Sequence, residues 1–172
     1  MAVSSLRYHF RQPLRVPAAD AFAWCTDFGP ADGSLFSHRT ERAVARLADD
    51  TFVLTDTTYP DGRRRRISRL VRILPAELAW TNTHLDGPFR HSQYWYRIVR
   101  DGPRRCHLDF YGSRLVTTPR ALSAPERARR AEEERRNDAR EWRRYLAPAL
   151  ERDLGVRSAS GLRAPRRSRI PR

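Results

Sequence analysis

Short turns divide the middle of this chain into strand-length segments, and one long helical segment follows them. The turns are expected at Ala48–Asp50, Pro60–Gly62, Asp86–Pro88 and Asp101–Pro103. Connections this short join antiparallel neighbours, because a parallel crossover needs a dozen or more residues. The helical segment runs from Ala124 to about Leu154. This order predicts a curved antiparallel sheet closed by a C-terminal helix, an arrangement that can enclose a pocket.

Seven strands are expected from the alternation of apolar and polar residues along these segments. The first spans Leu6–Leu14, where apolar side chains alternate with arginine and histidine. The other six are expected at Thr40–Leu47, Thr51–Tyr59, Arg64–Leu74, Leu78–Leu85, Arg90–Arg100 and Arg104–Val116. Two short helices are expected after the first strand, one from Pro17 to near Asp27 and one at Ser34–Ser37.

The long helix carries the strongest local signal in the chain. Ser123 and Glu126 have the spacing of a capping box, in which each side chain satisfies a backbone N–H of the other residue. Apolar residues then recur at helical spacing in the second half of the helix, at Trp142, Tyr145, Leu146, Ala149 and Leu150. We therefore expect the second half of the helix to pack on the sheet.

The charge of the chain is strongly positive and comes entirely from arginine. All 34 basic residues are arginine, and the formal net charge is +14. Such a charge attracts polyanions, although an arginine bias is also what a GC-rich coding sequence produces. A solvated arginine-rich surface and a surface that binds nucleic acid or an anionic membrane both stay open. A domain is expected over 1–155, followed by a disordered Arg-rich tail over 156–172.

Cysteine usage and hydropathy bound the remaining function classes. Cys25 and Cys106 are isolated, and no histidine cluster stands at metal-ligand spacing. The chain shows neither a signal-peptide pattern nor a run of about 18 apolar residues. It also has no G-x-S-x-G serine and no Gly-rich phosphate loop. We expect a reduced cytoplasmic protein, monomeric or homodimeric, with no metal, no cofactor and no identifiable catalytic residue.

One segment carries a family resemblance. Leu14–Phe28 reads L-R-V-P-A-A-D-A-F-A-W-C-T-D-F, which resembles the opening of START-like (SRPBCC) proteins, a superfamily that includes polyketide cyclase/dehydrase-like members. The resemblance covers about residues 6 to 154 and implies an α+β helix-grip fold with a cavity between the sheet and the last helix. Members bind lipids, polyketides, hormones or other apolar molecules, and only some are enzymes. The resemblance therefore implies a ligand cavity but does not identify the ligand.

Strand parity selects candidate ligand-binding residues, because one face of the sheet lies toward the helix and the other toward water. Tyr94 and Tyr96 are expected inside, with Arg97 outside. Phe110 is also expected inside, with Asp109 outside. A tyrosine can bury its ring while its hydroxyl orients a carbonyl, and simple core packing is the alternative.

The parity of two other strands leaves more than one interpretation. Arg69 shares the parity of core residues, so it needs a partner such as Asp56 or a ligand's carboxylate or phosphate, unless it reaches water at the strand end. Trp80, Asn82 and His84 share one face of their strand. If that face lies inward, an indole, an amide and an imidazole meet at a bound molecule; if it lies outward, they form a surface stripe.

Three functions compete at this stage. The first is binding of an apolar or aromatic small molecule, lipid- or polyketide-like, between the sheet and the helical stripe that contains Trp142. The second is a cyclase or dehydratase on the same fold, in which Tyr94, His84 or Arg69 polarises a carbonyl. The third is a basic adaptor for nucleic acid, the ribosome or an anionic membrane. The first two predict an internal cavity, and the third predicts a filled core.

Overall fold

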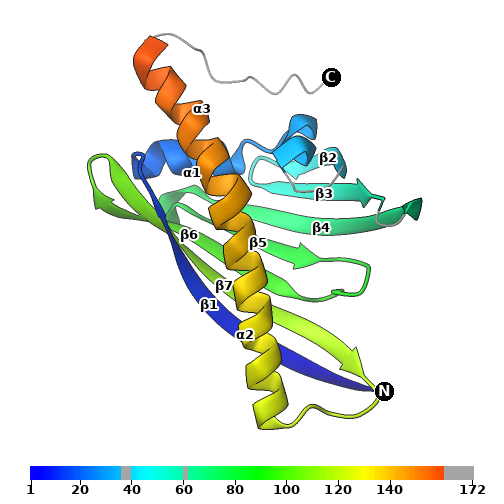
Figure 1. Cartoon of the computed structure of the whole chain (residues 1–172). Helices are drawn as coiled ribbons and strands as arrows, with labels where there is room; N and C mark the ends of the chain where they lie inside the picture. The colour runs from blue at the N-terminus through cyan, green and yellow to red at the C-terminus, as the bar shows by residue number, and fades with distance from the viewer. Residues whose placement is uncertain (36–39, 60–61, 161–172) are drawn as a thin grey trace.

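A computed structural model describes residues 1–35, 40–59 and 62–160, and in it one long helix lies across a seven-stranded antiparallel sheet (Figure 1). The strands are β1 (Ala2–Leu14), β2 (Thr40–Ala48), β3 (Thr51–Thr58), β4 (Arg65–Leu74), β5 (Ala79–His84), β6 (Gln93–Gly102) and β7 (Arg105–Thr118). Their order in the sheet is β1-β7-β6-β5-β4-β3-β2. The predicted α+β helix-grip fold is confirmed.

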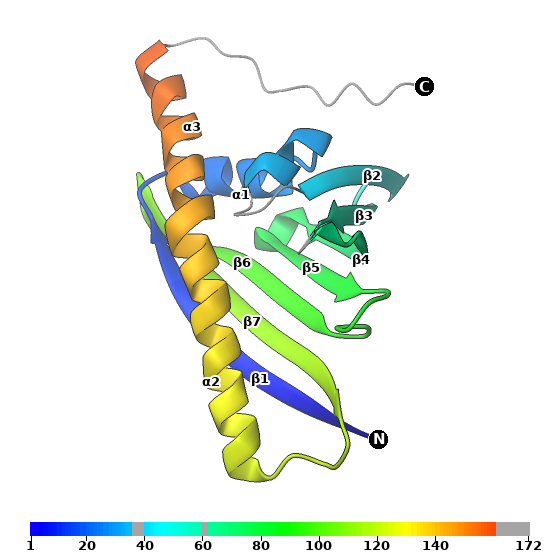
Figure 2. The ribbon, with the colours of Figure 1, turned by 45° about the vertical axis from the view of Figure 1, so that its right-hand side comes forward.

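The described helices are α1 (Ala18–Thr26), η1 (Pro30–Leu35), η3 (Pro75–Glu77), α2 (Ala124–Glu141), the π-helical turn η4 (Trp142–Leu146) and α3 (Ala147–Ser160). The helices α1, α2 and α3 lie on one side of the sheet (Figure 2), and the short η3 stands in the connection between β4 and β5. The helix predicted at Ser34–Ser37 is instead η1, because Asp32 accepts a hydrogen bond from the Gly29 N–H at 2.9 Å and starts the turn early. Residues 36 and 37 lie outside the described residues.

The long helix consists of α2, η4 and α3 in succession. The predicted capping box is present: the Glu126 side chain accepts from the Ser123 N–H at 2.8 Å, and Ser123 Oγ accepts from the Glu126 N–H at 3.5 Å. α3 ends at Ser160, beyond the expected end near Leu154. Residues 161–172 of the predicted tail lie outside the described residues. None of the described helices is long and apolar enough to span a membrane.

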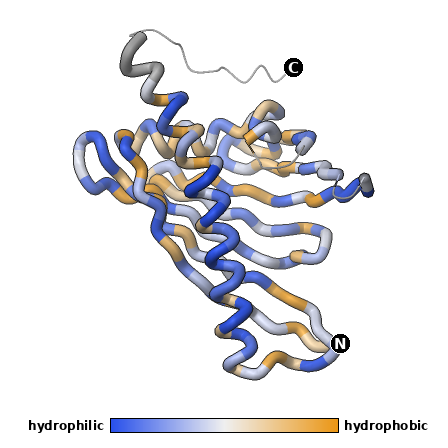
Figure 3. The backbone as a smooth tube through the Cα atoms, in the orientation of Figure 1, coloured by the Kyte–Doolittle hydropathy of each residue, from blue (hydrophilic) through white to orange (hydrophobic). Residues whose placement is uncertain are grey.

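The second half of this helix packs on the sheet, as predicted. Figure 3 shows α2 as predominantly hydrophilic, and none of its residues, all of which are described, is buried. Trp142, Ala149 and Leu150 of the predicted apolar stripe are buried, while Tyr145 and Leu146 are half-buried. The fully buried side chains of the helix therefore begin at η4, while Ala131 and Ala139 of α2 pack half-buried against the core beside β1.

The π-helical turn has a local cause in the sequence. Pro148 has no N–H to donate to the carbonyl of Arg144, and its ring clashes with that carbonyl in a regular helix. The Ala147 N–H instead donates to the Trp142 carbonyl, five residues back. The widened turn stands where the long helix meets the cavity described below.

One close approach fixes the packing of the first strand. Tyr8 of β1 pairs with Gly112 of β7, and a Cβ at Gly112 would lie 2.5 Å from the Tyr8 ring. Only glycine leaves room for this ring. The parity predictions also hold on these strands, since Phe110 is buried inside and Asp109 lies on the outer face. Asp109 is nevertheless buried, because Arg11 donates to it across the outer face.

Candidate ligand-binding cavity

Two adjoining cavities lie between the sheet and the long helix. The first, called the large lobe here, has a volume of about 580 Å³, and the second, the small lobe, has about 320 Å³. Five residues line both lobes: Arg69, Asn82, Tyr96, Trp142 and Leu146. The lobes therefore form one site divided by shared side chains. The core is not filled, in contrast to the expectation of the basic-adaptor hypothesis.

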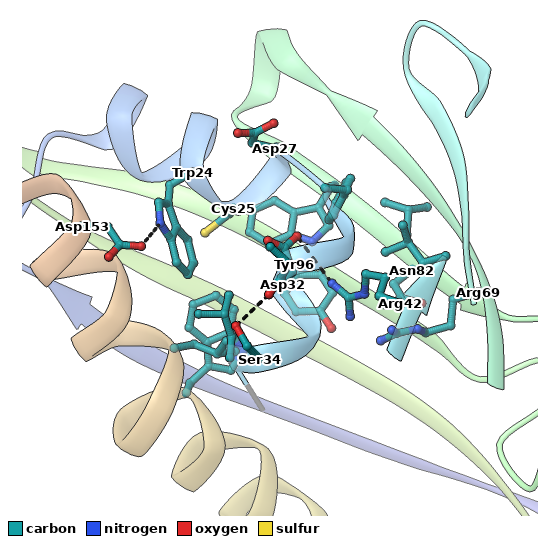
Figure 4. Close-up of a pocket in the computed structure, with 18 of the residues that line it drawn as sticks. Trp24, Cys25, Asp27, Asp32, Ser34, Arg42, Arg69, Asn82, Tyr96 and Asp153 are labelled. Atoms are coloured by element: carbon teal, nitrogen blue, oxygen red, sulfur yellow. Dashed lines mark hydrogen bonds and ion pairs between the residues drawn. The ribbon is translucent and has the colours of Figure 1, made fainter. Parts of the chain in front are cut away.

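Aromatic rings form much of the wall of the large lobe. The rings of Trp80 and Tyr96, opposite each other on β5 and β6, stack with centroids 4.8 Å apart and planes 4° apart. Trp142 of η4 lies 6.5 Å from the Tyr96 ring. At the other end, Trp24 of α1 donates through Nε1 to Asp153 of α3 at 3.1 Å, as Figure 4 shows. This bond ties α1 to the long helix over the lobe.

A buried ion cluster stands at the side of the large lobe toward β2. Asp56 accepts hydrogen bonds from Arg42 Nε at 2.7 Å and from Arg42 Nη2 at 2.9 Å, and a third from Arg69 Nη2. Asp56 is 8% exposed, and the Arg42 side chain is 6% exposed. Of the alternatives weighed for Arg69, pairing with Asp56 is the one observed. Figure 4 shows Arg42 and Arg69 on the same side of the lobe as Asn82.

Charged and phenolic groups line the small lobe. Arg114 donates through Nε to the Tyr94 hydroxyl at 3.1 Å, pairs with Glu134 of α2, and lies 4.2 Å from the Phe89 ring. Burial raises the pKa of the Tyr94 hydroxyl, so this group stays protonated at neutral pH. Arg114 therefore has one partner on the sheet, Tyr94, and one on the long helix, Glu134.

A second link joins the long helix to β1 at the small lobe. The Tyr8 hydroxyl donates to Asp138 Oδ2 at 2.6 Å. Burial raises the pKa of the Asp138 carboxyl, although the Tyr8 hydrogen bond and the charge of Arg114 act in the opposite direction. Asp138 lines the small lobe. Burial there disfavours the charged form of its carboxyl group.

Three buried polar atoms on the cavity walls have no hydrogen-bond partner among the described residues. They are Arg69 Nε, Asn82 Oδ1 and His84 Nδ1. Arg69 and His84 are direct partners across β4 and β5, and Asn82 lies two residues from His84 on the same face. The face of Trp80, Asn82 and His84 therefore lies inward. An unpaired buried polar group costs about 1–3 kcal/mol, so each is a position where a ligand gains a hydrogen bond.

His84 is held neutral at physiological pH. Burial is the main cause, and the positive charges of Arg69 and Arg114 add to it, so the pKa of the imidazole falls from its ordinary 6.5 to about 4. Its ring lies 5.4 Å from the Tyr94 ring. A neutral imidazole can donate or accept a hydrogen bond, and its lowered pKa makes it a weak base toward a bound molecule.

The lowered pKa predicts a loss of stability in mild acid. Between pH 6.5 and 4 the unfolded chain binds a proton at His84 that the folded chain does not, so the free energy of unfolding falls as pH falls through this window. From pH 7.5 to 5 the loss is roughly 1–2 kcal/mol. Denaturant unfolding should show a shallower pH dependence for His84→Gln than for the wild type. Identical curves for wild type and His84→Gln would exclude a neutral His84.

All eight residues selected from the sequence line the two lobes. Trp80 lines the large lobe, the small lobe has His84, Tyr94 and Phe110, and both lobes share Arg69, Asn82, Tyr96 and Trp142. Their role in binding a ligand stays a prediction. The sequence reasoning missed Trp24, Arg42, Arg114 and Asp138. Arg114 had a usable signal, because it shares its parity with Phe110, whereas Asp138 lies in a helix segment that reads only as charged.

Comparison with known proteins gives matches of structure only. No family model and no curated protein matches the sequence. The Zhui aromatase/cyclase from a Streptomyces species matches with a TM-score of 0.67 at 14% identity, over 92% of this chain and 98% of that one. A START superfamily protein from Mycobacterium smegmatis matches with a TM-score of 0.58 at 15% identity, over 80% of this chain and 95% of that one.

An enzyme of plant origin has the same architecture. Norcoclaurine synthase from Thalictrum flavum, in complex with dopamine and hydroxybenzaldehyde, matches with a TM-score of 0.63 at 11% identity, over 90% of this chain and 88% of that one. At identities this low, the structural matches establish a shared fold and leave the function open. The chain therefore has the helix-grip fold of START-like proteins.

Proposed function

We propose that this protein binds an aromatic or otherwise apolar small molecule in the two-lobed cavity. The observation that carries the proposal is the convergence of three unpartnered polar atoms, on Arg69, Asn82 and His84, within walls that are otherwise rich in aromatic rings. Ligand sites commonly combine apolar walls with a few polar groups that fix orientation, and they commonly have volumes of about 300–1,000 Å³. Both lobes fall within that range.

The polar atoms restrict the chemistry of the ligand. The Arg69 Nε–H donates, so it suits a carbonyl or phenolate oxygen, and Asn82 Oδ1 accepts, so it suits a hydroxyl. The ring system of the ligand would lie against Trp80, Tyr96 and Trp142. A planar molecule with carbonyl and hydroxyl groups on one edge satisfies these positions. The structural matches to an aromatase/cyclase and to an enzyme complexed with hydroxybenzaldehyde support an aromatic class.

A competition experiment tests the role of the polar atoms. We expect anilinonaphthalene sulfonate to bind saturably, and naphthol to displace it more tightly than naphthalene. Asn82→Leu removes the unpartnered acceptor while keeping a similar volume, so it should reduce the preference for naphthol over naphthalene about fivefold. Thr81→Val, on the outer face of the same strand, is the matched control and should leave the preference unchanged. Absence of saturable dye binding, or an unchanged preference in Asn82→Leu, contradicts the proposal.

A cyclase- or dehydratase-type enzyme is the second candidate, favoured by the neutral His84 at the small lobe. Its imidazole, which is neutral at physiological pH, and the Arg69 guanidinium would donate hydrogen bonds to a carbonyl of the substrate and polarise it. The match to the Zhui aromatase/cyclase supports this reading. An enzyme of this type converts its bound substrate into a product lighter by one water, which mass spectrometry of the released molecule distinguishes from simple binding.

A further inference from the structure

The face of the sheet opposite the long helix carries three aromatic rings in a row. None of the described helices covers this face (Figure 2). Trp95 of β6 is the direct partner of Tyr111 of β7, and Tyr111 is the direct partner of His9 of β1. Trp95 is 38% exposed and Tyr111 is 49% exposed. The His9 and Tyr111 rings stack with centroids 4.4 Å apart. These three residues are called the aromatic row.

Arginines surround the aromatic row. Arg7 and Arg11 lie two residues on either side of His9 along β1, and Arg97 lies two residues from Trp95 along β6. Arg72 of β4 continues the row beyond Thr81, the partner of Trp95 on β5. All four arginines are exposed.

The acidic side chain among these rows does not cancel their charge. Asp109 lies between Arg11 and Arg97 in the register of β1, β7 and β6. It accepts from Arg11 Nε at 2.8 Å and contacts His9 Nε2 at 3.3 Å. Within the described part of the chain, Arg7 and Arg97 form no ion pair. Arg72 pairs with Asp50 at 3.7 Å, so Arg7 and Arg97 carry the positive charge that no carboxylate compensates in the described part of the chain. Exposed rings and this positive charge therefore share one surface.

The charge decides between the partners that an exposed aromatic surface can take. A symmetric contact with a second copy would bring the same arginines against one another, and each copy carries a formal charge of +14. Repulsion therefore disfavours a second copy. A partner that offers both flat rings and negative charge matches the surface. Single-stranded nucleic acid has both, since its bases have exposed π-faces and its backbone has one phosphate per nucleotide.

We propose that the aromatic row binds single-stranded nucleic acid. Bases stack on Trp95 and Tyr111, and phosphates lie beside Arg7 and Arg97. A duplex hides the faces of its bases, so the row should prefer a single strand. This surface lies on the opposite face of the sheet from the cavity, so the inference is independent of the proposed small-molecule site.

Fluorescence anisotropy of a labelled oligothymidine tests the proposal with the full chain. We expect the single strand to bind about tenfold more tightly than a duplex of the same length, with affinity that falls as salt rises. Trp95→Ala should weaken the single strand about tenfold, and Trp95→Phe should keep most of the affinity because a ring remains. Arg97→Gln should weaken binding more than Arg143→Gln, a matched loss of one exposed charge on the long helix.

Three results would overturn this inference. Equal affinity for duplex and single strand, or an unchanged affinity in Trp95→Ala, would show that binding depends on charge alone and not on the aromatic rings. Sedimentation that shows a dimer in the wild type and a monomer in Trp95→Ala would assign the surface to a second copy. Thermal melting confirms that each variant is folded. Dye binding in the cavity should be the same in Trp95→Ala and wild type, which separates this test from that of the cavity.

Discussion

Asp56→Asn is expected to lower the free energy of unfolding by about 3–5 kcal/mol. The carboxylate of Asp56 is buried and accepts hydrogen bonds from both Arg42 and Arg69. Asparagine keeps the shape of the side chain but removes the carboxylate that Arg42 and Arg69 share, and the Asp32 carboxylate lies farther from Arg42, at 3.7 Å. Breaking a buried ion pair from one side costs more than the pair itself contributes, because the remaining charge stays out of water. Urea unfolding followed by circular dichroism measures the loss.

The chain offers a matched control for this substitution. Asp49 also pairs with an arginine, Arg46, at 2.7 Å, but its side chain is fully exposed. Asp49→Asn should change the free energy of unfolding by less than about 1 kcal/mol, since exposed ion pairs contribute little. An equally small effect at both positions would show that Asp56 does not hold the arginines in the folded protein.

Trp142→Ala is expected to cost about 3–5 kcal/mol, the range for a buried aromatic side chain. Trp142 is 7% exposed, packs on Tyr96, and lines both lobes. Its removal enlarges the space between the lobes, so the substitution carries a cavity term as well as the loss of apolar burial. Thermal unfolding should show a fall in Tm of about 10 °C.

The neighbouring residue provides the comparison for Trp142. Arg143 lies in the same helical turn and is exposed, so Arg143→Ala should change Tm by only about 1–2 °C. A Tm for Trp142→Ala that equals the wild-type value would exclude the assignment of this ring to the core.

The fold was predictable because its signals are local. Short turns set the antiparallel pairing, Ser123 and Glu126 start the long helix, and parity places Tyr94 and Phe110 inside. Each of these signals lies within a few residues of the feature it predicts. The sequence did not show which face of β5 lies inward, because Trp80, Asn82 and His84 have no clear contrast of polarity with the residues between them. The register with β4 and β6 resolves it.

The polar network of the site could not be predicted, because it is formed by residues that are far apart in the sequence. Asp56 meets Arg42 across one strand pair, and no sequence pattern identifies that pairing. Tyr8 meets Asp138, which lies 130 residues away. Asp138 could not be recognised from the sequence, because the charged residues of α2 have the pattern of a helix exposed to solvent. These contacts depend on how the helix lies on the sheet.

Native mass spectrometry of the purified protein tests the central claim, that the cavity holds a small molecule. The mass measured under native conditions is compared with the mass of the denatured chain. We expect a defined additional mass that is retained under gentle ionisation and lost on denaturation, and that is absent or reduced when Trp142 is replaced by alanine. No additional mass, together with no binding of anilinonaphthalene sulfonate or naphthol, would contradict the claim.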